Sequence, residues 1–135
     1  MKASNSIKKN AGFVNKFLKK ELKGNPKQLY DAASHLILHG GKRLRPFLVL
    51  KSCQMLGGRQ SDAMAAASAV EMIHNFTLVH DDIIDHDETR HGLLTTHKTF
   101  DIPLAILAGD VLYSKAYQTI SSKSKLSFHS TTLFA

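Results

Sequence analysis

The sequence is poor in cysteine and contains no long apolar run. Cys53 is its only cysteine, so an internal disulfide and a multi-cysteine metal cluster are both excluded. No apolar stretch approaches the roughly 20 residues that a membrane-spanning helix needs. The N-terminus also lacks the continuous apolar segment of a secretion signal. These absences predict a protein without a membrane span, in a reducing, cytoplasmic setting.

Acidic residues are fewer than basic ones. The sequence has 18 Lys and Arg and 11 Asp and Glu, which gives a formal net charge of +7. Such an excess favours polyanionic partners: nucleic acid, acidic lipid headgroups or phosphorylated small molecules. Much of it lies between Lys2 and Lys27, where lysines alternate with apolar residues at helical spacing. A solvated helix face is the simplest interpretation of that segment. No base-reading motif or aromatic platform indicates nucleic acid.

Apolar residues recur at three- and four-residue spacing, and sustained period-two alternation is missing, so the sequence predicts an all-α fold in one domain. Breakers and caps place helices at about 6–22, 27–39, 46–56, 61–85 with Ser61 as N-cap, and 101–120. A loop is expected over 86–99. The segment 121–135 is rich in hydroxyl residues and is expected to be a disordered or aberrant tail.

The longest expected helix ends in the run Asp81-Asp82-Ile83-Ile84-Asp85. At about 100° per residue, the three aspartates are expected to share one side of the helix with His74. Like charges this close destabilise a helix, and a bound cation would relieve the repulsion. Hard oxygen ligands without a thiolate favour Mg²⁺, whereas the nearby histidines match no common zinc spacing. The alternative is an exposed, solvated acidic helix end.

Cationic residues lie on both sides of this run. The segment Gly40-Gly41-Lys42-Arg43-Leu44-Arg45-Pro46 precedes a helix, and Arg90 follows the aspartates. Arg makes planar, bidentate contacts with phosphate, Lys adds a point charge, and Mg²⁺ would supply the remaining neutralisation. The combination favours a diphosphate site, although the cationic loop taken alone also fits an exposed turn.

Together these motifs resemble the trans-isoprenyl diphosphate synthases, all-α prenyltransferases that include the farnesyl and geranylgeranyl enzymes. Four family motifs match in order: Gly-Gly-Lys-x-x-Arg-Pro at 40–46, Glu-x-x-His at 71–74, Asp-Asp-x-x-Asp at 81–85 and Ala-x-Leu-Ala-Gly-Asp at 105–110. The resemblance implies that 1–120 forms the N-terminal part of the isoprenoid synthase helical bundle. It also implies transfer of a prenyl group from an allylic diphosphate to isopentenyl diphosphate, with Mg²⁺, by a family that forms homodimers.

The resemblance implies a site for isopentenyl diphosphate with three side chains on its diphosphate: Lys42, Arg45 and His74. His91 stands where the family usually has a second arginine, and an imidazole is only partly charged near neutral pH. Leu94 replaces a usual proline, so the loop that contains it is expected to differ.

For the allylic diphosphate, the resemblance implies that Asp81 and Asp85 ligate Mg²⁺, that Asp82 supports them, and that Arg90 contacts the same diphosphate. The reaction then needs no protein nucleophile. It depends on electrostatic stabilisation of a leaving diphosphate together with metal-ion catalysis.

Product length in this family depends on residues shortly before the first aspartate, and here those residues are Phe76 and Thr77. One aromatic with a small neighbour resembles the archaeal-type geranylgeranyl diphosphate synthases. An ordinary core phenylalanine is an equally good interpretation of Phe76.

The family's second aspartate-rich motif has no match, because no Asp or Glu follows Asp110. We therefore expect a truncated chain that is inactive on its own, since half a site binds diphosphate poorly and does not exclude water. The alternative is a noncatalytic helical partner of a complete synthase.

Overall fold

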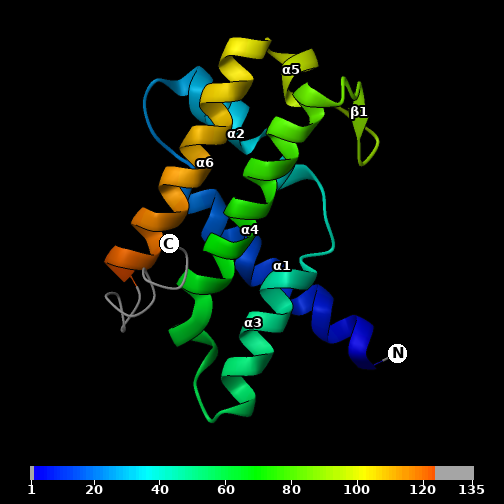
Figure 1. Cartoon of the computed structure of the whole chain (residues 1–135). Helices are drawn as coiled ribbons and strands as arrows, with labels where there is room; N and C mark the ends of the chain where they lie inside the picture. Colours follow the sequence, from blue (N-terminus) through cyan, green and yellow to red (C-terminus); the bar gives the residue numbers. More distant parts are fainter. Residues whose placement is uncertain (1, 124–135) are drawn as a thin grey trace.

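The computed structural model describes the backbone of residues 2–123 and the side chains of 5–123, and within that part of the chain the protein is helical apart from one pair of short strands (Figure 1). The helices are α1 (Lys2–Glu21), α2 (Lys27–His39), α3 (Leu44–Met55), α4 (Gln60–Ile84), α5 (Thr96–Thr99) and α6 (Ile102–Lys123), and the strands are β1 (Thr89–Arg90) and β2 (Leu93–Leu94). The all-α fold class is confirmed.

The helix ends differ from the expected ones at several places. α1 begins at Lys2, before the expected start near residue 6, and α6 continues to Lys123, beyond the expected end at Ile120. Residues 121–123, expected to belong to an aberrant tail, are therefore helical. The remainder of that predicted tail, 124–135, lies outside the described residues.

The N-cap of α4 is Arg59 and not Ser61, so the cap prediction was wrong. The carboxylate of Asp62 accepts a hydrogen bond from the backbone N–H of Arg59 at 3.3 Å and satisfies one free donor of the first turn. An acidic side chain in the first turn also suits the positive end of the helix dipole.

The segment 86–99 is not the plain loop that was expected. β1 pairs antiparallel with β2, with Thr89 opposite Leu94 and Arg90 opposite Leu93, and α5 follows directly. The two turn residues, His91 and Gly92, have φ values of 53° and 80°. Positive φ at both positions is typical of the tight type I′ turn that joins short antiparallel strands.

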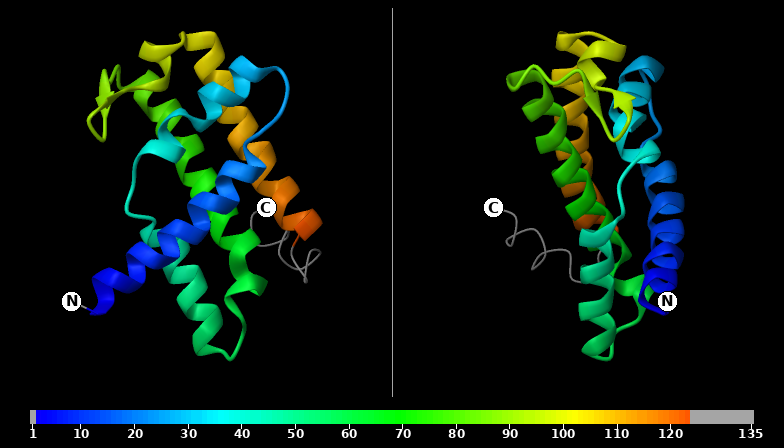
Figure 2. Two further views of the ribbon diagram at one scale, coloured as in Figure 1. Left: turned by 180° about the vertical axis from the view of Figure 1, so that it is seen from behind. Right: turned by 90° about the vertical axis from the view of Figure 1, so that its right-hand side faces the viewer.

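The long helix α4 forms the centre of the molecule and packs mainly against α6 and α3 (Figure 1). α1 and α2 lie together on one side of α4 and α6 (Figure 2). Small residues allow the close packing: a Cβ added to Gly109 of α6 would lie 2.3 Å from Nε2 of His80 on α4. Gly109, in the Ala-x-Leu-Ala-Gly-Asp motif at 105–110, is therefore a helix-packing residue. Within residues 2–123, no helix is both long and apolar enough to cross a membrane.

A buried ion pair holds the cationic loop between α2 and α3 against α4. The side chains of Arg43 and Glu71 are only 3% and 5% exposed, and Nη1 of Arg43 lies 3.0 Å from Oε1 of Glu71. The Arg43 guanidinium also donates from Nε to Oδ1 of Asn15 at 2.7 Å, and from its other nitrogens to the carbonyls of Ile37 and Gly40. One side chain thus joins α1, α2 and α4.

The backbone of the loop is shaped to turn this arginine inward. Gly41 and Arg43 have φ values of 88° and 55°, in the left-handed region that glycine adopts without strain. A Cβ on Gly41 would lie 2.7 Å from Nη1 of Arg43, so glycine is required beside the guanidinium. With Arg43 inside, the neighbouring Lys42 and Arg45 remain exposed.

We predict that Arg43→Ala lowers the free energy of unfolding by about 3–5 kcal/mol, because it leaves the Glu71 carboxylate buried without its partner. Lys42→Ala is the matched control, since Lys42 is the next residue and is exposed, and it is expected to change stability by less than about 0.5 kcal/mol. Urea unfolding followed by circular dichroism measures both values. Equal stability of the two variants would contradict the structural role of Arg43.

Candidate functional site

The aspartates at the end of α4 do not all face the same way. Asp81 and Asp85 are exposed, whereas Asp82 is fully buried. The expectation that three carboxylates converge is therefore wrong for Asp82, because a step of one residue turns a helix by about 100°. Among the described residues, no group of three or more His, Cys, Asp and Glu is arranged to hold a metal ion.

Asp82 instead anchors the strand hairpin that follows α4. Its Oδ1 accepts a hydrogen bond from Nε of Arg90 at 2.5 Å, and its Oδ2 is buried without a hydrogen-bond partner among the described residues. Burial raises the pKa of Asp82, and the hydrogen bond and charge of Arg90 oppose that rise. Arg90 was expected to contact a diphosphate. Its Nε instead donates to Asp82 inside the protein.

The end of α4 brings a second carboxylate to Arg90. His86 adopts φ 57°, the Asp87 N–H bonds the Asp82 carbonyl at 3.0 Å, and the His86 N–H bonds that of Ile83 at 3.4 Å. This is the hydrogen-bond pattern of a Schellman helix end. It places Oδ2 of Asp87 3.2 Å from Nη2 of Arg90.

Asp81 and Asp85 have the properties of magnesium ligands. They lie four residues apart, one turn of helix, and neither forms an ion pair with any residue between 5 and 123. Mg²⁺ takes one or two protein carboxylates and fills its other positions with water and phosphate oxygens. Two free carboxylates therefore fit Mg²⁺, and the donor set of the predicted site is Asp81 and Asp85.

Three of the expected basic residues, Arg45, Arg90 and His91, act on His74, which lies on the same helix as Asp81. The pKa of His74 is lowered, first by burial and then by the charge of Arg45, with further lowering by Arg90 and His91 and an opposing effect of Glu71. These charges come from α3, the hairpin and α4. The field at His74 is positive, which disfavours a proton and favours an anion.

The cationic loop and the hairpin are in contact. A Cβ added to Gly40 would lie 3.3 Å from Cβ of His91, so the first glycine of the loop packs against the turn residue of the hairpin. The hairpin is also fixed to α2, because Nε2 of His35 lies 2.8 Å from the carbonyl oxygen of Leu94. Lys42 is exposed in the same loop.

Phe76 belongs to a row of aromatic rings across α4 and α6. Its centroid lies 4.7 Å from that of His80 and 5.2 Å from that of Tyr113, and Tyr113 lies 4.9 Å from Tyr117. Thr77 is exposed, and its hydroxyl donates to the carbonyl of His74 at 2.8 Å. The tyrosines were missed from the sequence, although their spacing of four residues on one helix was a usable signal.

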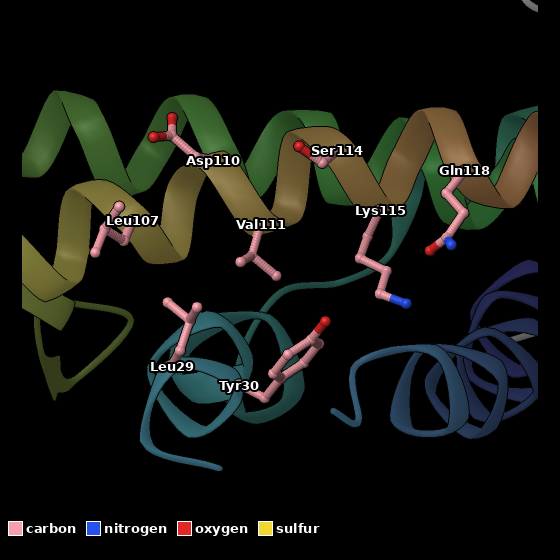
Figure 3. A pocket seen from close by; sticks show the side chains of 8 residues that line it. All are labelled: Leu29, Tyr30, Leu107, Asp110, Val111, Ser114, Lys115 and Gln118. Carbon is pink, nitrogen blue, oxygen red and sulfur yellow. The ribbon is translucent and has the colours of Figure 1, made fainter. Parts of the chain in front are cut away.

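A cavity of about 500 Å³ lies between α2 and α6. Figure 3 shows Leu29 and Tyr30 of α2 facing Val111 and Lys115 of α6 across it. None of the predicted site residues lines this cavity. Its walls are largely apolar apart from Asp110, Ser114, Lys115 and Gln118.

Comparison with known proteins identifies close similarity along most of the chain. The family model described as Polyprenyl synthetase matches residues 26–135. The chain is 50% identical over 119 residues to a geranylgeranyl pyrophosphate synthase of Geoglobus acetivorans. That alignment covers 87% of this chain and 37% of the relative. It is 47% identical over 108 residues to the geranylgeranyl diphosphate synthase of Sulfolobus acidocaldarius, across 80% of this chain and 33% of the relative.

Solved structures of geranylgeranyl pyrophosphate synthetases are also similar to this chain. The geranylgeranyl pyrophosphate synthetase of Pyrococcus horikoshii matches with a TM-score of 0.90 and 40% identity, over 97% of this chain and 40% of that one. The Geoglobus acetivorans enzyme matches with a TM-score of 0.83, over 87% of this chain and 39% of that one. The chain thus spans about two fifths or less of the length of these relatives.

We predict that Arg45→Gln raises the pKa of His74 toward its ordinary value, because it removes the largest of the charges that lower it. Titration of the imidazole signals by NMR measures the shift. Lys51→Gln removes one charge further along α3 and is expected to leave the His74 pKa unchanged. If both variants behave like the parent chain, Arg45 does not act on His74.

Proposed function

The chain belongs to the polyprenyl synthetase family, and from that premise we propose that it carries one wall of a prenyl-transfer site that joins isopentenyl diphosphate to an allylic diphosphate. The observation that supports this most directly is the pair of exposed, unpaired carboxylates, Asp81 and Asp85, on the helix that also presents His74 to the charges of Arg45 and Arg90. We propose geranylgeranyl diphosphate as the product, because the relatives named above are described as synthases of that compound.

In this proposal the diphosphate of isopentenyl diphosphate lies at the meeting point of the cationic loop and α4. Lys42 contributes a full charge from the loop and Arg45 contributes one from the first turn of α3. His74 contributes an imidazole whose pKa is lowered by burial and by the charge of Arg45. Diphosphate binding would raise the His74 pKa and add a third positive group. His91, at the hairpin turn, is proposed to lie beside the same diphosphate, since it packs against Gly40 of the cationic loop.

The allylic diphosphate is proposed to lie beside Asp81 and Asp85. Mg²⁺, when bound there, supplies neutralisation of the charge that develops on the leaving diphosphate. Arg90 is held by Asp82 and Asp87, so its guanidinium is already oriented when the diphosphate arrives, and its side chain is still 24% exposed. A preorganised cation stabilises a leaving group well, because no reorientation is needed as the charge develops.

We extend the proposal to product length and cellular setting. Phe76 with Thr77 is proposed to limit the growing prenyl chain, and the stacking of Phe76 against Tyr113 would stiffen that limit. The family resemblance supports a homodimer, and the single cysteine is consistent with a cytoplasmic location.

The first test is binding of a non-cleavable thiolo analogue of farnesyl diphosphate by isothermal titration calorimetry. We expect binding that requires Mg²⁺, with affinity reduced at least about tenfold in Asp81→Asn and in Asp85→Asn, because each loses a metal ligand. Asp31→Asn is the control, since Asp31 pairs with Lys27 on α2 and has no place in the proposed site. Affinity that is independent of Mg²⁺ would sink the magnesium assignment.

The second test is turnover by the 135-residue chain. With radiolabelled isopentenyl diphosphate, an allylic primer and Mg²⁺, we expect no prenyl product, because Asp81 and Asp85 supply only one set of metal ligands and the sequence after Asp110 offers no further carboxylate. Robust prenyl product from the chain alone would contradict this expectation. Binding without turnover would support the proposed division of the site.

A further inference from the structure

A second surface, formed by the outer face of α1, is unused by the proposed function. α1 lies on the outside of the bundle (Figure 2). It carries exposed lysines at positions Lys8, Lys9, Lys16, Lys19 and Lys20, and none of them forms an ion pair with a described residue. Its one acidic residue, Glu21, is paired with Lys123 of α6. The helix therefore presents a positive face without compensating charge.

Aromatic side chains border the lysines along one edge. At about 100° per residue, Lys9, Lys16 and Lys20 fall within a narrow arc, and Phe13 and Phe17 follow immediately beside it. Phe13 is 46% exposed. The residues buried against the core, Val14 and Leu18, lie further round the helix.

The same edge borders a groove of about 420 Å³ between α1 and the first turns of α4. Its walls combine apolar surface with two lysines, and its lining residues are Phe13, Lys16, Phe17, Lys20, Ser61 and Met64. Lys123, which is paired with Glu21, lies near the same edge, with its Nζ 5.6 Å from the centroid of the Phe17 ring. No acidic side chain lines the groove.

We propose that this face of α1 docks on the surface of an anionic phospholipid bilayer. Lysines on one side and aromatics beside them are the arrangement of helices that lie in the plane of a membrane interface. The lysines would meet the phosphate groups, while Phe13 and the apolar groove would meet the acyl boundary. Charge complementarity selects an anionic bilayer, since a neutral surface leaves the lysines without partners.

The docking surface is separate from the proposed diphosphate site. Met64 and Asp81 lie 17 residues apart on α4, which corresponds to about 25 Å along the helix axis. The inference does not rest on the proposed function, and failure of one leaves the other intact.

The test is co-sedimentation of the 135-residue chain with vesicles of phosphatidylcholine alone or with about 30% phosphatidylserine. We expect at least about tenfold stronger binding to the anionic vesicles, weakening as salt rises. Lys16→Glu with Lys20→Glu is expected to remove most of that gain. Lys51→Glu with Lys115→Glu, which makes the same change in net charge elsewhere, is expected to retain it.

Insertion into the bilayer is measured separately by tryptophan fluorescence. The chain contains no tryptophan of its own, so an introduced one gives the whole signal. Phe13→Trp provides a single fluorophore in the proposed contact, and its emission is expected to shift to the blue on anionic vesicles only. Equal loss of binding in the two doubly reversed variants would overturn the proposal, as would an unshifted emission. A dimer in solution that Phe13→Ser converts to a monomer, with vesicle binding unchanged, would assign the groove to a second copy of the chain and also overturn it.

Discussion

The ion pair between Arg43 and Glu71 determines how the cationic loop meets α4. A charge this deeply buried is stable only with a partner and with its remaining donors satisfied, and Arg43 has both, from α1, α2, α4 and its own loop. Because Arg43 occupies the interior, Lys42 and Arg45 on either side stay at the surface. The positions of the proposed phosphate contacts thus follow from a residue that makes no such contact itself.

Asp82, near the end of α4, and Glu71, in its middle, have the same structural role. Each is a buried carboxylate that fixes a cation from another segment, Arg43 in one case and Arg90 in the other. The two anchored segments then meet, where Gly40 packs against His91. Asp81 and the C-cap residue Asp85 form no ion pair with a described residue, and they are the carboxylates proposed to bind a metal ion.

The sequence predicted the helices well because long amphipathic segments repeat their pattern many times, and it located α2 and most of α4 closely. It did not predict β1 and β2, since strands of two residues carry no periodicity and are set by the His91-Gly92 turn. It also did not separate Asp82 from Asp81 and Asp85, or Arg43 from Lys42 and Arg45. Motif spacing identifies a set of charged residues, but the direction of each depends on tertiary packing.

We propose that a diphosphate binds where the cationic loop, the end of α4 and the hairpin meet. The most direct measurement is the change in backbone amide NMR signals of the ¹⁵N-labelled chain on addition of inorganic pyrophosphate and Mg²⁺. If the diphosphate binds there, the largest shifts are expected at Lys42, Arg45, His74, Asp81 and Arg90. Shifts concentrated instead along the cavity between α2 and α6, at Tyr30, Val111 and Lys115, would contradict it.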